Sequence, residues 1–314
     1  MGSEMSLKSA TSLALTVDVE GEWFGLPGEQ GSFELQKIVD AVRNLELLLE
    51  RMESGLGVRI PVTWFIRCDD SVEAVTGAVS GLLQSLEGFI VRRSALGDEF
   101  GVHPHLYRLQ EGQWVSETGS DRQIEQVERA VRAWESYFGS LPAVSRMGEA
   151  VMNNSLANAI NELGIACDSS ALAGRKRFDS GFQFDWTGTP SMPYHPSTVD
   201  YRRPAENGEA KYRFLEVPFT MLPITAPIDL NPVNRYCNLA FRPELIESAL
   251  KSMATPDRVI AVVHPHELLT SIHQHPLISH SATSLEKNIL NLTAAFGELK
   301  FVLLSECITG HSEN

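Results

Sequence analysis

The sequence has few cysteines and no close cysteine pair. Its four cysteines, Cys68, Cys167, Cys237 and Cys307, are separated by about 70 to 100 residues. A structural zinc site needs ligand pairs only a few residues apart, so this class of site is disfavoured. We expect all four to be buried free thiols.

The sequence also lacks a long apolar run. It contains no stretch of about 18 apolar residues, the length that a membrane-spanning helix needs. The apolar run nearest the N-terminus leads directly into Asp18, whereas a signal peptide would end in a small-residue cleavage site. These two absences predict a soluble, cytoplasmic protein.

Basic residues are in the minority. The 314 residues include 26 Lys and Arg against 40 Asp and Glu, which gives a formal net charge of -14. Nucleic acids and anionic membranes require a basic footprint, so neither is expected as a partner. Two local basic patches, Arg175–Arg177 and Arg202–Arg203, are still candidates for holding an anionic group.

Two common catalytic motifs are missing. The sequence has no G-x-x-x-x-G-K-[ST] phosphate loop and no G-x-S-x-G nucleophile elbow. Nucleotide hydrolysis and the commonest type of serine hydrolase are therefore disfavoured.

What the sequence does contain is an alternation of strand and helix patterns. Apolar runs typical of strands are followed by segments with apolar residues at helical spacing, and the rhythm loosens only in the Pro-, Gly-, Tyr- and Arg-rich residues 173–240. This alternation predicts a parallel sheet covered by helices, either a barrel or a doubly wound sheet. Without a repeat or linker, we expect one domain over residues 1–314, with a core at about 12–304. The predicted strands are 12–18, 58–67, 98–103, 142–146, 165–170, 258–264 and 300–305, with others near 182–186 and 213–220, and the predicted helices are 33–53, 72–86, 121–138, 153–163, 243–253 and 284–296.

Polar residues stand directly after several of these strands. They are Asp18 and Glu20, His103 and His105, Arg146, and His264 and His266. In parallel α/β folds the carboxyl ends of the strands share one rim, where chemistry is placed. We therefore expect these side chains to line a single pocket.

Each group on its own has a functional and a purely structural interpretation. His103 and His105 point the same way in an extended segment and with a carboxylate would form a three-ligand metal site, or they lie in a surface loop. His264 is a candidate general acid or a core histidine bonded to backbone. Arg146 orients a carboxylate or forms a surface ion pair. A further cluster, His273, His275 and His280, is expected in an exposed loop rather than at a functional metal site.

The ordered set of motifs resembles the polysaccharide deacetylase family, the NodB-homology domain of carbohydrate esterase family 4. The family's T-F-D-D-G motif is matched by "TVDVEG" at 16–21, its next strand by "VTWFI" at 62–66, and its G-H-E-I-G-x-H motif by "GDEFGVH" at 97–103. The arginine motif is matched by the segment 146–170, and the final histidine motif by "VVHPHEL". The resemblance spans about residues 12–304.

This resemblance implies a distorted (β/α) barrel, typically of seven strands, and metal-dependent removal of N- or O-acetyl groups from sugars. It assigns Asp18 as general base, Arg146 as the residue that orients it, and His264 as general acid. Glu20 and His103 would bind a divalent metal, zinc in the first instance, with cobalt or nickel as alternatives.

The sequence departs from the family pattern at two positions. Tyr107 stands where many members have the second metal histidine, so either His105 replaces that histidine or the site is altered. Glu20 replaces an aspartate. A backbone N–H near Tyr107 is expected to stabilise the oxyanion. Weaker candidates for substrate binding or support are Trp23, Tyr107, Asp185 and His266; Trp186, Tyr194 and Tyr201 could stack on sugars, although core packing is the commoner role.

The expected partner is an acetylated sugar or oligosaccharide, such as a precursor of a surface polysaccharide like the O-antigen. Two alternatives stay open: a metal-independent amidohydrolase on the same scaffold, and a catalytically silent glycan-binding module. The sequence predicts neither the particular sugar nor the oligomeric state.

Overall fold

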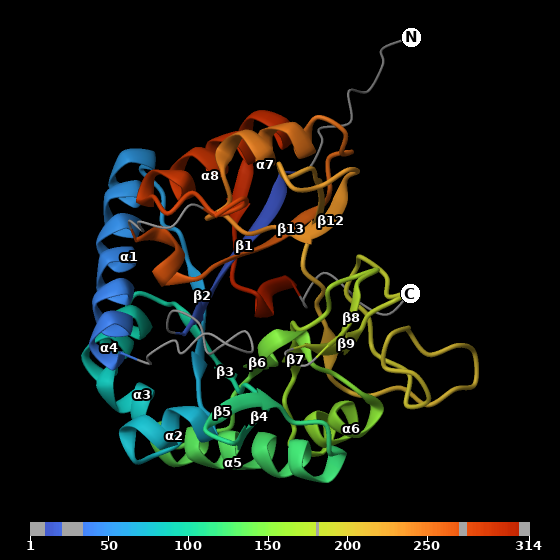
Figure 1. Cartoon of the computed structure of the whole chain (residues 1–314). Coiled ribbons are helices and arrows are strands. Elements are labelled where there is room, and N and C mark those ends of the chain that lie inside the picture. The colour runs from blue at the N-terminus through green and yellow to red at the C-terminus, as the bar shows by residue number, and fades with distance from the viewer. Residues whose placement is uncertain (1–9, 21–33, 180–181, 270–274, 308–314) are drawn as a thin grey trace.

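The chain is built around one curved parallel sheet (Figure 1). The computed structural model describes residues 10–20, 34–179, 182–269 and 275–307. Seven strands follow one another across the sheet, and the eighth, β14 (Leu299–Phe301), pairs with the start of β1. In spatial order the seven are β10 (Leu215–Glu216), β7 (Cys167–Asp168), β6 (Val144–Ser145), β3 (Glu99–His103), β2 (Val62–Arg67), β1 (Thr11–Val19) and β13 (Arg258–Val263).

The open side of this half-barrel is bridged by irregular chain. The amide of Thr220, just beyond β10, donates to the carbonyl of Ile260 in β13 (3.1 Å), and the amide of Leu239 donates to the carbonyl of Val262 (2.8 Å). Parallel strands curled in this way, with helices outside, confirm the predicted distorted (β/α) barrel.

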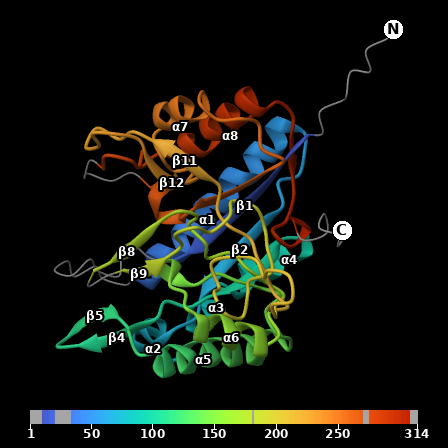
Figure 2. The same ribbon diagram turned by 90° about the vertical axis from the view of Figure 1, so that its right-hand side faces the viewer.

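Helices cover the outside of the sheet (Figures 1 and 2). The hydrophobic spacing of α1 directs Ile38, Leu45 and Leu49 into the core, while the opposite face is polar. The helices are α1 (Leu35–Leu56), α2 (Asp70–Thr76), α3 (Gly81–Ser85), α4 (Glu87–Ala95), α5 (Ser120–Phe138), α6 (Asn154–Glu162), α7 (Pro243–Leu250) and α8 (Ala282–Phe296), with short 3₁₀ turns η1 (Gly148–Ala150), η2 (Pro265–Leu268) and η3 (Ser305–Cys307).

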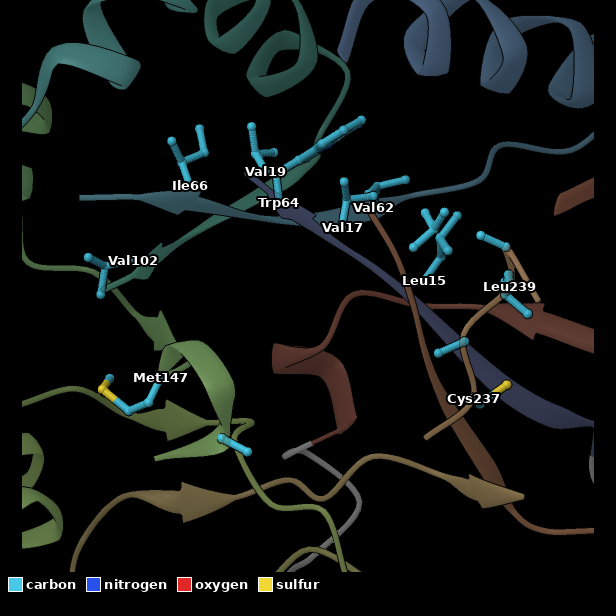
Figure 3. Close-up of a cluster of buried hydrophobic side chains, with 14 of the residues drawn as sticks. Leu15, Val17, Val19, Val62, Trp64, Ile66, Val102, Met147, Cys237 and Leu239 are labelled. Atoms are coloured by element: carbon cyan, nitrogen blue, oxygen red, sulfur yellow. The ribbon is translucent and has the colours of Figure 1, made fainter. Parts of the chain in front are cut away.

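Alternate residues of the central strands face two different cores. On β1, Leu13, Leu15, Val17 and Val19 pack toward the helices, whereas Ala14 belongs to a second cluster inside the barrel. Strands β2 and β13 divide in the same way: Trp64 and Ala261 lie in the helix-side core, while Phe65 and Val262 lie inside. Figure 3 shows Val17, Val19, Trp64 and Ile66 on the face of the sheet that carries the helices. Even-numbered residues at the end of β1 therefore face the barrel interior.

Some predicted elements differ from those observed. The single helix expected over 72–86 is divided into α2 and α3, because Gly77, with φ of 84°, ends α2. The strand predicted near 182–186 is β9 (Gln183–Asp185), which pairs with β8 (Lys176–Phe178) in an antiparallel hairpin. The sequence patterns missed β8 and two further antiparallel hairpins: β4 (Tyr107–Gln110) with β5 (Gln113–Ser116), and β11 (Met221–Ile224) with β12 (Val233–Tyr236). Their short, mixed strands do not show clear alternation.

All four cysteines are buried free thiols, as predicted. Among the described residues, no helix has both the length and the apolar character needed to cross a bilayer. Of the residues singled out from the sequence, Trp23 and His273 lie outside the described ranges.

Candidate active site

One pocket, of about 320 Å³, gathers most of the polar residues that follow the strands. Its volume lies within the range of small-molecule sites. Of the candidates from the sequence, the pocket is lined by Asp18, Glu20, His103, His105, Arg146, His264 and His266. Four separate strand ends thus deliver charged side chains to one hollow.

Arg146 holds one oxygen of Asp18. Its guanidinium donates to Asp18 Oδ1 (2.5 Å), to the Thr16 hydroxyl (2.9 Å) and to the backbone and hydroxyl oxygens of Ser169. The rings of Phe65 and Phe219 each lie 4.2 Å from the guanidinium carbon. Arg146 is therefore fully engaged inside the barrel, and Asp18 keeps its second oxygen, Oδ2, for the pocket.

Glu20, His103 and His105 form a compact set of three ligand atoms, all within 4.8 Å of one another. Glu20 Oε2 lies 2.8 Å from His105 Nε2 and 3.8 Å from His103 Nε2, and the two Nε2 atoms are 3.1 Å apart. Two imidazoles bound to one tetrahedral zinc, at about 2.0–2.1 Å each, would place their nitrogens about 3.3 Å apart. The observed spacing therefore suits a shared cation.

The second nitrogen of His103 supports this interpretation. His103 Nδ1 lies 2.8 Å from the carbonyl oxygen of Arg146, which accepts only if Nδ1 carries the proton. Nε2 is then the unprotonated nitrogen in neutral His103, and it faces Glu20 and His105. Metal-binding histidines are commonly held in this way by a backbone carbonyl.

The protonation states of the other two residues also fit a cation. Burial, together with the positive charge of Arg67, lowers the pKa of His105 to about 4, which favours the neutral imidazole. Burial alone would raise the pKa of Glu20, but the neighbouring imidazoles lower it well below its usual value. Burial would lower the pKa of His103, but the charges of Asp18 and Glu20 raise it, so a cation bound here would have to displace a proton from His103. With that proton displaced, the two imidazoles and the carboxylate are a donor set that binds zinc and similar divalent ions.

Gly148 makes room for the His105 ring. A Cβ at this position would lie 2.3 Å from His105 Cδ2, far closer than any real contact. The next two residues, Glu149 and Ala150, both have φ of 54°, a strained conformation for residues with side chains. The chain after Arg146 is thus shaped closely around the imidazole.

His264 also lies close to the carboxylates of Asp18 and Glu20. Its Nε2 lies 3.7 Å from Asp18 Oδ2 and 3.5 Å from Glu20 Oε1. Its Nδ1 lies 2.9 Å from Glu267 Oε2, and both oxygens of Glu267 accept from the Asn238 amide. Burial would lower the pKa of His264, but the charges of Glu267, Glu20 and Asp18 outweigh it and raise the pKa to about 10. His264 is therefore an imidazolium, able to give up a proton.

Sequence reasoning missed Glu267 and Glu149. Glu267 follows His264 by three residues, the spacing of a capping box at the start of η2, and this spacing could have identified it from the sequence. Glu149 lines the pocket, accepts from the Tyr107 hydroxyl (2.9 Å), and has its pKa raised to about 7 by burial and by the charge of Glu20. Glu149 follows Arg146, the last residue of the predicted strand 142–146, by three residues, the same spacing that separates Glu267 from His264.

The weaker candidates have different positions. His266 lines the pocket with its ring 5.8 Å from that of His264, and the Tyr107 ring lies 5.4 Å from that of His105. The backbone N–H of Tyr107, expected to face the oxyanion, instead donates to the carbonyl of His105 (3.1 Å). The carboxylate of Asp185 lies away from the pocket lining, where it accepts from the Thr187 amide and from Arg202.

The described candidates Trp186, Tyr194, Tyr201, His275 and His280 do not line this pocket. Trp186 is fully buried and donates through Nε1 to the carbonyl of Ala150 (2.9 Å), which matches the core-packing alternative. The ring of Tyr201 packs against it at 5.0 Å. Of the expected histidine cluster, His275 and His280 lie with ring centres 6.4 Å apart.

Comparison with known proteins gives a fold likeness. No model of a protein family matches the chain, and no curated protein matches it in sequence. Among solved structures, the chain is similar to a protein from Mycobacterium smegmatis proposed to be a polysaccharide deacetylase (15% identity, TM-score 0.54) and to PuuE allantoinase (12% identity, TM-score 0.55). Each alignment covers 96% of this chain and 90% of the other. At these identities the likeness shows the shared fold.

Proposed function

We propose that the protein is a metal-dependent hydrolase that removes N- or O-acetyl groups from a sugar in a glycan or glycan precursor. The observation that carries the proposal is the meeting of three parts in one pocket. A carboxylate held by Arg146, an imidazolium at His264, and a two-histidine, one-carboxylate ligand set all lie within a few ångströms of one another. The motif order and the fold likeness to a proposed deacetylase agree with it.

Glu20, His103 and His105 would hold a divalent cation, zinc or alternatively cobalt or nickel. Such an ion polarises an acyl carbonyl and acidifies water. The protein's own contribution is the fixed orientation of the ligands: His103 is held by the Arg146 carbonyl, and His105 is confined by Gly148.

Asp18 and His264 would move the protons. Asp18 Oδ2, the oxygen that Arg146 leaves open, takes the proton from the attacking water. His264, charged and held through Nδ1 by Glu267, donates the Nε2 proton to the leaving amine or hydroxyl. Both atoms face the same space at 3.7 Å from each other, which suits a base and an acid that act on opposite ends of one scissile bond.

Acetate release tests the proposal directly. The purified chain, loaded in turn with zinc, cobalt and nickel, is incubated with acetamido sugars, O-acetylated sugars and chitooligosaccharides. We expect metal-dependent acetate release from at least one class, and its loss in His103→Ala. A matched variant, His275→Ala, removes an imidazole outside the pocket and should retain activity. The absence of acetate with every metal and substrate would contradict the proposal.

A second candidate is an amidohydrolase that acts without metal on a cyclic or linear amide. The observation that favours it is the fold likeness to an allantoinase, at a TM-score of 0.55. Metal analysis separates the two candidates: about one equivalent of metal per chain, with activity abolished by a chelator and restored by the ion, supports the first. Chelator-resistant cleavage of a cyclic amide would support the second. Tight sugar binding with no turnover would instead indicate a glycan-binding module.

A further inference from the structure

Two arginines of the β8–β9 hairpin border the pocket. Arg175 precedes β8 and Arg177 lies within it, and both line the cavity together with Phe182 and Phe184. Lys176, between them, is exposed and does not line the cavity. Successive side chains of an extended segment point to opposite faces, so the spacing of two brings both guanidinium groups to the pocket side.

Arg175 is a half-buried cation with no carboxylate partner among the described residues. Its guanidinium donates to the backbone carbonyl of Asn234 in β12 (2.6 Å). Burial, and then the nearby positive charges of Arg235 and Arg177, lower its pKa. Arg235 itself is already paired with Asp229 (2.7 Å). Burying a charge without an opposite charge is unfavourable, so Arg175 is stabilised by any anion that enters the pocket.

Arg177 is positioned beside it by two contacts. Its guanidinium carbon lies 3.8 Å from the centre of the Phe182 ring, and its Nε donates to Asp179 (2.5 Å). An arginine stacked on a ring keeps its fork of N–H donors in a defined plane, which suits phosphate or carboxylate oxygens.

The charges of the pocket are unevenly distributed. Its lining carboxylates, Asp18, Glu20, Glu149 and Glu267, come from other segments, as do Arg67 and Arg146, while Arg175 and Arg177 come from the hairpin. Asp179, which pairs with Arg177, does not line the pocket. This positive pair occurs in a chain whose formal net charge is -14. A ligand with an anionic group would therefore be repelled by one part of the pocket and attracted to the other, which fixes its orientation.

We propose that the pocket takes an anionic sugar, one that carries a phosphate or a carboxylate, and that Arg175 and Arg177 bind that group. This inference rests on the proposed function, because that proposal places the acetyl group of the sugar beside Asp18 and His264. Phosphate and carboxylate both offer a pair of anionic oxygens to a guanidinium, so the two groups must be separated by experiment.

The test compares three acetamido sugars that differ in charge. They are N-acetylglucosamine, N-acetylglucosamine 1-phosphate and 2-acetamido-2-deoxyglucuronic acid. Equilibrium affinity is measured by calorimetry and kcat/KM by acetate release, with the full chain. We expect at least one anionic sugar to be preferred over the neutral one by about 10-fold or more, the range of a charge-assisted hydrogen bond. Whichever anionic sugar is preferred identifies the group.

Substitutions assign the preference to the hairpin. Arg175→Gln should reduce the anionic-to-neutral ratio by about 10-fold, Arg177→Gln by less because Arg177 is more exposed, and Arg175→Lys should restore part of it. Lys176→Gln makes the same charge change on the other face of β8 and should leave the ratio unaltered. Equal affinity for all three sugars, or an equal loss in Lys176→Gln, would overturn the inference. Because Arg177 is exposed, its variant gives the answer even if Arg175→Gln fails to fold.

The readouts separate this inference from the proposed function. Acetate release from neutral and anionic sugars at equal rates would leave the hydrolase proposal intact and overturn the anion site. An Arg175-dependent preference in binding, with no acetate released from any sugar, would support the anion site and contradict the hydrolase.

Discussion

The two sides of the pocket are built in different ways. Asp18, His103 and His264 extend from or directly follow long parallel strands, whose ladders fix the direction of each side chain. Arg175, Arg177 and Phe182 come from a short antiparallel hairpin within the irregular residues 173–240. The first side places the groups that we propose for proton transfer and metal binding on rigid elements. The second presents charge and aromatic surface from segments that can vary without disturbing the barrel.

The largest effect is expected on the strand side, at Asp18. Asp18→Asn keeps the shape and the hydrogen bond from Arg146 but removes the proton acceptor. We expect kcat to fall by about 10³-fold, within the range for loss of a general base. The thermal unfolding midpoint measured beside the rate serves as the control. A variant with undiminished kcat would contradict the role of Asp18.

The next effect concerns the space around His105. Gly148→Ala adds a methyl that would lie 2.3 Å from the imidazole, so the ring must move away from Glu20 and His103. We expect metal affinity to fall by about 10- to 100-fold, measured by competition with a chromogenic chelator. Gly88→Ala, where the nearest atom is a flexible arginine end at 3.6 Å, is the matched control. Unaltered affinity would show that His105 is not a ligand.

A smaller effect is expected from the partner of His264. Burial opposes the positive charge on His264, and the carboxylate of Glu267 is the first group that offsets it. Glu267→Gln should therefore lower the pKa of His264. Because a general acid must be protonated, activity is lost as pH rises through that pKa, and the alkaline limb of the kcat profile should move to lower pH in the variant. An unmoved limb, with kcat reduced, would indicate only a structural role.

The smallest effect is expected where the regular strands meet the irregular region. Asp168 of β7 and Glu216 of β10 are buried register partners, and burial raises the pKa of both, for Glu216 with a further contribution from the Asp168 charge. The folded state thus retains protons that the unfolded chain releases. The stability this provides is full below the ordinary carboxyl pKa of about 4 and is lost as pH rises toward the folded value.

Glu216→Gln removes this titration while its side-chain oxygen can still accept from the Ser170 and Ala171 amides. Denaturant unfolding should show the variant more stable than the parent by about 1 kcal/mol at pH 8, with a smaller difference at pH 5. Glu206→Gln, on the exposed surface, should show no such dependence on pH. A parallel pH dependence in parent and Glu216→Gln would contradict the retention of a proton on Glu216 in the folded state.

The strand side could be anticipated from sequence because its rules are local. A strand repeats every two residues, so Asp18 and Glu20, or His103 and His105, share a face wherever the strand lies. Parallel strands end at one edge, which brings those pairs together. The hairpin side has no comparable rule. Its two strands have three residues each, and only β9 coincides with a predicted strand, near 182–186. Glu149, elsewhere in the pocket, is presented by a strained turn rather than by a strand.

By itself, then, the order of residues determined the alternation of strands and helices and the burial of the four thiols. It also determined which face of their strands Asp18, His103 and His105 lie on. The contact between Arg146 and Asp18, across more than a hundred residues, was expected only through the family resemblance. Tertiary structure alone decided that Asn238 braces Glu267 and that Arg175 lacks a carboxylate among its described neighbours. The physical reason is the distance along the chain over which each property is decided. Side-chain direction follows from the backbone period of a few residues, whereas the charge around a side chain depends on segments brought together only when the barrel closes.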